Sequence, residues 1–267
     1  YDNIFTSNGG GSVQVTISEK TLNDIQIPIP ENITTIKPQL ESLKKLHEQI
    51  TKDTELIPQK EKHIMNLIKK LTDDGVEGVD YESNKFDECI NYLPKKINIK
   101  LSEAKHEGKY RFYSNGEYKN LYVDKCMYTE KYIIMGFVGN IAINIDSNFS
   151  VLDREVYVLN SKYSTNDYMY YYLRSTINNF INMQHKSTIG RISKEVIKNM
   201  NINILKPSIM KKHKLQVLFD EVDKLKETLE SNKKTYQNQM DNLFKDFKNQ
   251  EKEQHNKSIQ PNQIKES

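Results

Sequence analysis

Side chains able to contact nucleic acid gather in three segments in the middle of the chain. Arginine can hold a guanine edge with two hydrogen bonds, asparagine can hold an adenine edge in the same way, and lysine neutralises phosphates. Arg111 and Arg191 are the strongest candidates for contacts to guanine, whereas Asn115 and Asn140 could either bind adenine or hold a turn. The candidate DNA-binding residues are Lys109, Arg111, Tyr113, Ser114 and Asn115 in the first segment, Asn140 and Arg154 in the second, and Lys186, Ser187, Thr188 and Arg191 in the third.

The distribution of charge favours the same region as a nucleic-acid-binding surface. The whole chain has a formal net charge of +3. Residues 85–206 contain 18 basic and 12 acidic residues, so their net charge is +6 and the rest of the chain is net −3. A domain that faces DNA needs such a local positive surplus.

Each of these motifs also has a simpler structural explanation. Ser114-Asn115-Gly116 has the composition of an ordinary tight turn. Residues 136–139 are better explained as a turn between strands, and no Gly-Lys-Ser/Thr follows that would make them a phosphate-binding loop. The tyrosines of residues 168–172 could stack on bases. Tyrosines three and four positions apart share a helix face, however, and this spacing favours a packed amphipathic helix.

We expect no catalytic, metal or cofactor site. The chain lacks Asn-Pro-Pro-Tyr and Phe-x-Gly-x-Gly for a methyl donor, and it lacks Pro-Asp followed by Glu-x-Lys for a metal-dependent nuclease. Asp153-Arg154-Glu155 offers two carboxylates without a third ligand. Cys89 and Cys126 lie 37 positions apart, without histidines at metal-ligand spacing. Reduced thiols would suit a cytoplasmic protein.

Two heptad stripes predict long helices on either side of the basic region. The first helix is expected over residues 35–73, where Pro58 predicts a kink or a break, and the second over residues 208–249. The helices could pair within one molecule, as an antiparallel spacer, or oligomerise as a generic coiled coil. The polar members of the stripes, which would fix the register at some cost in stability, are His47, Thr54, Glu61 and Asn232.

Between the helices, the pattern predicts a mixed α+β domain. We expect an acidic linker at residues 74–88, the domain at residues 89–207 and a disordered tail at residues 250–267. The clearest helix inside the domain covers residues 167–183. Strands, indicated by β-branched and aromatic residues between turn residues, are expected at 97–101, 121–123, 132–137, 141–145, 156–159 and 202–204.

An internal repeat links the two ends of the chain. Residues 17–30 align with residues 192–205 at an offset of 175 positions, and each copy precedes a heptad helix. The repeat indicates two copies of a domain-plus-helix unit. Because residues 1–34 are too few to bury a core alone, we expect them to be the C-terminal remnant of a first domain that begins upstream.

Three stretches, in this order, resemble the target recognition domain of type I restriction-modification specificity (S) subunits. They are residues 108–116 (GKYRFYSNG), residues 132–140 (YIIMGFVGN), and residues 167–173 (DYMYYYL) together with 187–193 (STIGRIS). The resemblance covers roughly residues 1–249. The chain departs from the family pattern at Lys186, where a small residue is usual, and at Phe137, where a basic residue is common.

The resemblance implies an α+β fold, in which a globular mixed α/β target recognition domain is flanked by two long helices forming an antiparallel coiled coil. It implies sequence-specific binding of double-stranded DNA at one half of a bipartite target, with the helices as a spacer. DNA methyltransferase subunits would dock on the outer helix faces, and a restriction subunit is a further candidate partner. Two alternatives stay open: the recognition module of a fused type II restriction-methyltransferase, and a coiled-coil interaction protein with no DNA role.

Overall fold

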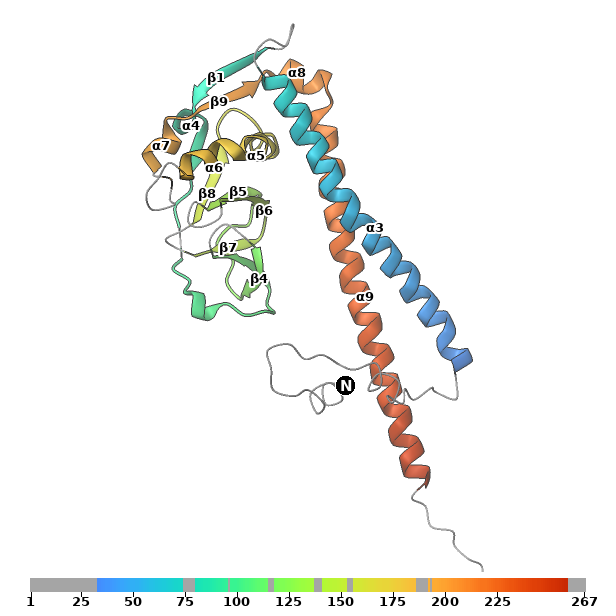
Figure 1. Ribbon diagram of the computed structural model, residues 1–267. Helices are drawn as coiled ribbons and strands as arrows, with labels where there is room; N and C mark the ends of the chain where they lie inside the picture. The colour runs from blue at the N-terminus through green and yellow to red at the C-terminus, as the bar shows by residue number, and fades with distance from the viewer. Residues whose placement is uncertain are drawn as a thin grey trace, which may run out of the picture. The chain divides into compact units, whose positions relative to one another are not determined.

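The computed structural model describes residues 33–73, 80–95, 97–114, 118–136, 141–152, 156–185, 192 and 194–258. The first copy of the internal repeat therefore lies outside the described residues. The chain divides into two compact units, one of residues 1–51 and 231–267 and the other of residues 52–230. Two long helices, α3 (Ile33–Thr72) and α9 (Leu215–Ser258), contribute to both units (Figure 1).

In the first unit, the beginning of α3 packs against the end of α9. Ile36 and Leu43 of α3 form a buried apolar cluster with Leu243 of α9. The ring centroids of His47 and Tyr236 lie 5.7 Å apart. Later residues of α3 thus meet earlier residues of α9, which means that the two helices run antiparallel. The antiparallel pair implied by the family resemblance is confirmed, and His47 contacts the opposite helix as a seam residue would.

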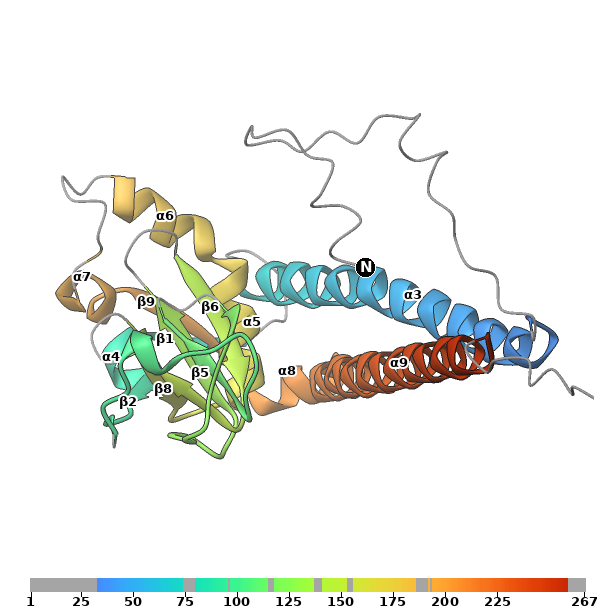
Figure 2. The same ribbon diagram turned by 90° about the horizontal axis from the view of Figure 1, so that it is seen from below.

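In the second unit, three β-sheets are seen among the described residues (Figures 1 and 2). The largest sheet is antiparallel throughout and has the strand order β2-β8-β5-β6. The second sheet has the order β4-β3-β7, with β3 antiparallel to β4 but parallel to β7. A small antiparallel sheet joins β1 to β9. The strand bounds are β1 Tyr81–Lys85, β2 Ile90–Tyr92, β3 Tyr110–Tyr113, β4 Tyr118–Val123, β5 Tyr132–Gly136, β6 Ala142–Asp146, β7 Phe149–Val151, β8 Val156–Ser161 and β9 Asn201–Leu205.

The apolar core of this unit lies between the two larger sheets. Phe112 of β3 and Phe149 of β7 are fully buried against Ile134 of β5 and Val158 of β8. Each strand contributes β-branched or aromatic side chains, which favour the extended conformation and suit a pleated surface. Burying a side chain of this size stabilises the fold by about 1.5–3 kcal/mol, so this core fixes how the two sheets pack.

Helix α5 (Asn166–Ser175) packs on the largest sheet, against β5, β6 and β8. Thr165 caps α5, since its side chain accepts a hydrogen bond from the backbone N–H of Tyr168. Tyr168 is fully buried, and its hydroxyl donates to the carbonyl of Asn203 at 2.7 Å. The prediction of a packed tyrosine helix is confirmed. The remaining elements are α4 (Phe86–Cys89), η1 (Leu101–Glu103), α6 (Ile177–His185), α7 (Lys194–Lys198) and α8 (Pro207–Lys212).

Several predicted boundaries need correction. The α3 helix continues through Pro58, because apolar side chains on either side of it stay buried against the rest of the fold. The predicted linker 74–88 contains β1 and the start of α4. Residues 97–101 are not a strand, and residues 167–183 are split into α5 and α6 at Thr176. Strands β1, β2, β3 and β7 were not expected.

The second long helix also differs from its prediction. A short helix, α8, precedes α9, and Lys214 between them has a φ of 52° that ends α8. The α9 helix then runs to Ser258, into the predicted disordered tail, because residues 250–258 are mostly good helix formers. Among the described helices, none combines the length and the apolar character that crossing a membrane requires.

Candidate nucleic-acid interface

The parallel pairing of β3 and β7 brings two predicted DNA-binding segments to one end of the second sheet. Tyr113 pairs with Val151, and the backbone N–H of Leu152 donates to the carbonyl of Tyr113 at 2.8 Å. In a parallel pair both strands end at the same edge. Ser114 and Leu152, the last described residues before residues 115–117 and 153–155, therefore lie side by side at the end of the sheet.

In the largest sheet, the end of β5 and the starts of β6 and β8 lie at this same edge. Gly136, at the end of β5, pairs with Val156 at the start of β8 and with Ala142 at the start of β6. Val156 and Val151 belong to one apolar core, and only residues 152–155 connect them. We call the place where β3, β5 and β7 end and β8 begins the strand-end edge.

Four of the eleven predicted contact residues, Ser114, Asn115, Asn140 and Arg154, belong to segments that join the strands at this edge. Asn115, Asn140 and Arg154 lie outside the described residues, but the strands that precede and follow them converge there. Ser114 is described and is half-buried at the end of β3. The third predicted group, between α6 and α7, also lies outside the described residues: Lys186, Ser187, Thr188 and Arg191.

Arg111 and Tyr113 occupy one face of β3 and share a carboxylate partner. The Tyr113 hydroxyl donates to Asp146 Oδ2 at 2.8 Å. Arg111 Nη1 lies 3.4 Å from the same carboxylate, and its Nη2 lies 3.2 Å from Glu230 Oε2 on α9. Burial alone would lower the pKa of Arg111, but the negative charges of Asp146 and Glu230 outweigh it and raise the pKa. A guanine contact by Arg111 would require the release of both carboxylates, and it stays a prediction.

Lys109 lies away from the strand-end edge. It precedes β3, so the whole strand separates it from Ser114. Its exposed ammonium group lies 5.1 Å from the ring centroid of Tyr110, within the range of a cation–π contact. Lys109 is therefore not brought together with Ser114, and its phosphate contact stays a prediction.

Lys95 is a cation at the strand-end edge that the sequence did not identify. Its Nζ donates to the carbonyl of Leu152 at 3.2 Å. The preceding Pro94 is anchored by the Tyr128 hydroxyl, which donates to its carbonyl at 3.1 Å. The only sequence signal was the Lys95-Lys96 pair after a proline, and its position depends on a contact between residues 57 positions apart.

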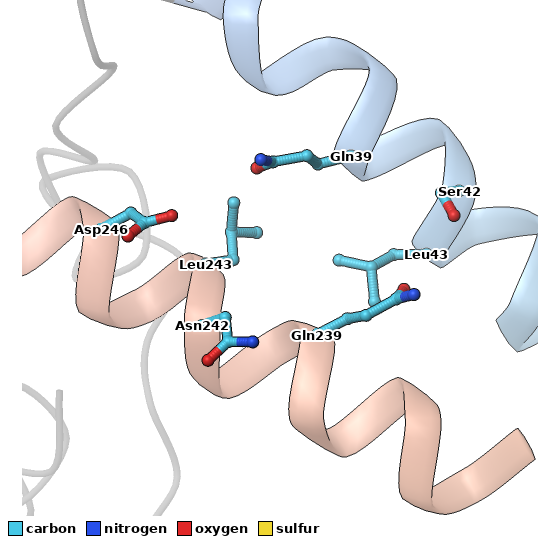
Figure 3. Close-up of a pocket in the computed structure, with 7 residues that line it drawn as sticks. All are labelled: Gln39, Ser42, Leu43, Gln239, Asn242, Leu243 and Asp246. Carbon is cyan, nitrogen blue, oxygen red and sulfur yellow. The ribbon is translucent and has the colours of Figure 1, made fainter. Parts of the chain in front are cut away.

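The first unit carries a separate feature that could receive a protein partner. A pocket of about 250 Å³ lies between α3 and α9, with Leu43 and Leu243 as its apolar residues and Gln39, Gln239 and Asn242 among its polar ones (Figure 3). On the same two helix segments, Leu40 and Phe244 are 46% and 42% exposed. We take this surface as a candidate site for a protein partner.

No ligand set for a metal ion is found among the described residues, in which three or more His, Cys, Asp or Glu side chains never come together. Both cysteines are free; Cys89 is buried and Cys126 is half-buried.

Comparison with known proteins gives a structural likeness only. No protein-family model and no curated protein matches the sequence. A type I restriction-modification system S subunit from M. genitalium superposes with a TM-score of 0.56 at 16% identity, over 87% of this chain and 67% of that one. The HsdS subunit from Thermoanaerobacter tengcongensis is a weaker likeness, with a TM-score of 0.40 and 11% identity over 88% of this chain and 61% of that one. So is a chain from a structure of complex assembly and conformational transition of the type I R-M system, with a TM-score of 0.46 and 12% identity over 91% of this chain and 67% of that one. The chain therefore has the fold of a type I restriction-modification S subunit.

Proposed function

We propose that this chain is a DNA specificity subunit of a type I restriction-modification system and reads one half of a bipartite target. One observation supports the proposal: parallel β3–β7 pairing, together with the β5–β8 and β5–β6 registers, brings to a single edge the strand ends next to Asn115, Asn140 and Arg154 in sequence. Amides and a guanidinium on adjacent segments suit base edges in a major groove. Lys95 and the net positive charge of the domain suit the phosphates.

The helices have a different role in this proposal. Methyltransferase subunits, and in some assemblies a restriction subunit, would dock on the α3–α9 pair and leave the domain free for DNA. The pocket between the helices and the exposed Leu40 and Phe244 support this docking. The chain itself would be non-catalytic and would work without a cofactor.

An electrophoretic mobility shift with random duplex DNA, repeated at rising salt, tests DNA binding. We expect binding at low salt that weakens steeply as salt rises, because each neutralised phosphate releases counterions. Asn115→Ala combined with Arg154→Ala should weaken the complex. Lys44→Ala on the exposed face of α3 should not, and it serves as the matched control. No shift at low salt would contradict the proposal and favour a coiled-coil interaction protein.

A further inference from the structure

The α9 helix carries a second stripe of side chains next to the seam that faces α3. Phe219, Asp223, Lys226 and Glu230 recur at spacings of four, three and four residues, so they share a helix face. The Phe219 ring stacks on Tyr171 of α5 with centroids 5.3 Å apart. The three charged residues all form ion pairs within the second unit.

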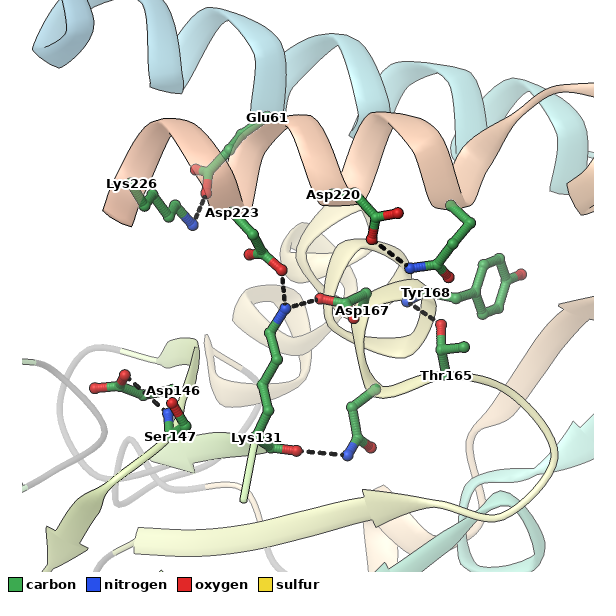
Figure 4. Close-up of polar contacts among 12 residues, drawn as sticks. Glu61, Lys131, Asp146, Ser147, Thr165, Asp167, Tyr168, Asp220, Asp223 and Lys226 are labelled. Atoms are coloured by element: carbon green, nitrogen blue, oxygen red, sulfur yellow. Dashed lines mark hydrogen bonds and ion pairs between the residues drawn. The ribbon is translucent and has the colours of Figure 1, made fainter. Parts of the chain in front are cut away.

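Lys131 forms the central contact of this stripe. Its Nζ lies between two carboxylates, Asp167 of α5 at 2.5 Å and Asp223 of α9 (Figure 4). The lysine is held in place from its other end, because its backbone carbonyl accepts a hydrogen bond from the Asn166 side chain at 2.8 Å. Burial raises the pKa of Asp167 and the Lys131 ammonium partly offsets this, so the half-buried carboxylate depends on its partner.

In two further contacts, as in Lys131–Asp223, the cation belongs to the domain and the carboxylate to a long helix. Arg111 of β3 reaches Glu230, as described above. Arg174 of α5 reaches Glu61 of α3 at 2.9 Å, and Lys226 of α9 binds the other oxygen of Glu61 at 2.6 Å. The side chain of Glu61 is only 11% exposed, so both cations compensate a charge that is largely removed from water.

The sequence of charges along α9 places acidic residues opposite both Lys131 and Arg111, and keeps Phe219 on Tyr171, at one axial position of the domain. Asp223 and Glu230 are separated by two helical turns, about 10.5 Å along the axis. A shift of the domain by four residues in either direction would bring Arg111 opposite Lys226 or Lys234. A shift of three residues toward the start of α9 would keep acidic residues opposite both cations. It would also place Gln216 where Phe219 now stacks and rotate the contact by about 60°.

We propose that Lys131–Asp223 and Arg111–Glu230 are positioning contacts that set the axial register of the recognition domain on α9. The consequence for DNA binding rests on the proposed function: the register fixes where the strand-end edge meets DNA relative to α9. Arg111 is then a positioning residue, and base reading belongs to the segments attached to the edge.

Charge exchange across each pair tests the proposal directly. The double variant Lys131→Asp/Asp223→Lys again has one lysine and two carboxylates, with the lysine now on α9. The double variant Arg111→Glu/Glu230→Arg likewise has one arginine, now on α9, and two carboxylates, one of which is Asp146. Spin labels at Ser102→Cys in the domain and Thr228→Cys on α9, both exposed positions, in a Cys126→Ser background, would report the register through pulsed electron-resonance distances. Circular dichroism would confirm that each variant is folded.

We expect one narrow distance distribution for the parent protein, a broadened or shifted one for each single reversal, and recovery in each exchanged pair. A displacement by one helical turn would shift the distance by about 5 Å. Glu230→Lys is the mildest reversal, since the Glu230 side chain is 56% exposed, and it keeps the test valid if Lys131→Asp fails to fold. Glu227→Lys, on an exposed position of α9 without an ion pair to a described residue, is the matched control.

A narrow distribution that stays unchanged in Glu230→Lys and Asp223→Lys would overturn the positioning role, as would failure of both exchanged pairs to recover it. The distance measurement needs no DNA. Absence of DNA binding by the parent protein would therefore count against the proposed function alone, while the register would still be judged by the distances.

Discussion

At the scale of single residues, the tyrosines of α5 are structural. The Tyr168 hydroxyl donates to the Asn203 carbonyl and accepts the backbone N–H of Leu205 at 3.3 Å. The Tyr172 hydroxyl accepts the backbone N–H of Asn203 at 3.1 Å. These bonds tie α5 to β9, the strand that leads into α8 and α9. The sequence predicted a packed helix from the spacing of the tyrosines, but no local signal identified their partners some thirty residues away.

Replacing Tyr168 by Phe should destabilise the protein by about 1–2 kcal/mol, since a buried carbonyl and N–H would lose their partner while the ring volume is kept. Urea unfolding followed by circular dichroism measures the change. Tyr163→Phe is the control, because the Tyr163 side chain is 66% exposed and surface changes of this kind usually stay within about 0.5 kcal/mol. Equal effects of the two substitutions would show that the hydrogen bonds of Tyr168 contribute nothing.

The two thiols should differ in reactivity. Burial raises the pKa of Cys89, and the nearby Glu88 carboxylate adds to the shift. A raised pKa means that less thiolate is present at any pH below it, and the thiolate is the reactive form. At pH 8, iodoacetamide should modify the half-buried Cys126 before the fully buried Cys89, as peptide mass spectrometry would show. Modification of Cys89 at the same rate in the folded protein would contradict its placement.

At the scale of elements, the heptad stripes predicted both long helices, because the apolar period is a local property of the sequence, whereas their antiparallel pairing was implied only by the family resemblance. The continuity of α3 through Pro58 was not predicted. A proline removes one backbone hydrogen bond and crowds the preceding turn, yet Ile57 and Ile64 are buried on the side of the helix that packs against the fold. Burial by tertiary packing outweighs the local penalty, and a sequence pattern does not report that balance.

Pro58→Ala should therefore stabilise the protein by about 1–3 kcal/mol, since the exposed proline would be replaced by a residue that restores the missing hydrogen bond. The midpoint of urea unfolding should rise. Gln59→Ala, at the neighbouring exposed position, should change it little. A lower midpoint for Pro58→Ala would mean that the proline holds a bend that the packing of α3 requires.

The outer surface of the first unit gives a prediction about partners. Leu40→Asp combined with Phe244→Asp should leave the protein folded, because nearly half of each residue is exposed. If methyltransferase subunits dock there, the same double variant should lose co-purification with its cognate methyltransferase subunit. Lys45→Asp, exposed on α3, is the charge control. Full retention of the subunit by the double variant would remove this surface from the docking site.

At the scale of the whole molecule, the candidate DNA interface depends on strand pairing between distant parts of the chain. The residue types in each segment could be identified from the sequence. That the strand ends next to Asn115, Asn140 and Arg154 share one edge follows from the parallel contact of β3 with β7 and from the registers of β5 with β6 and β8. Neither β3 nor β7 was expected as a strand, since both are short and their stability comes from the core around Phe112 and Phe149.

The central claim is that the strand-end edge reads DNA bases, and selection of bound sequences from random duplexes tests it most directly. The parent protein should enrich one short motif. Asn115→Ala and Arg154→Ala should each relax the preference at a different position, at a cost of about 1–3 kcal/mol per lost base contact, while Lys44→Ala leaves the motif intact. Absence of any enriched motif, or a motif unchanged by both edge substitutions, would contradict the claim.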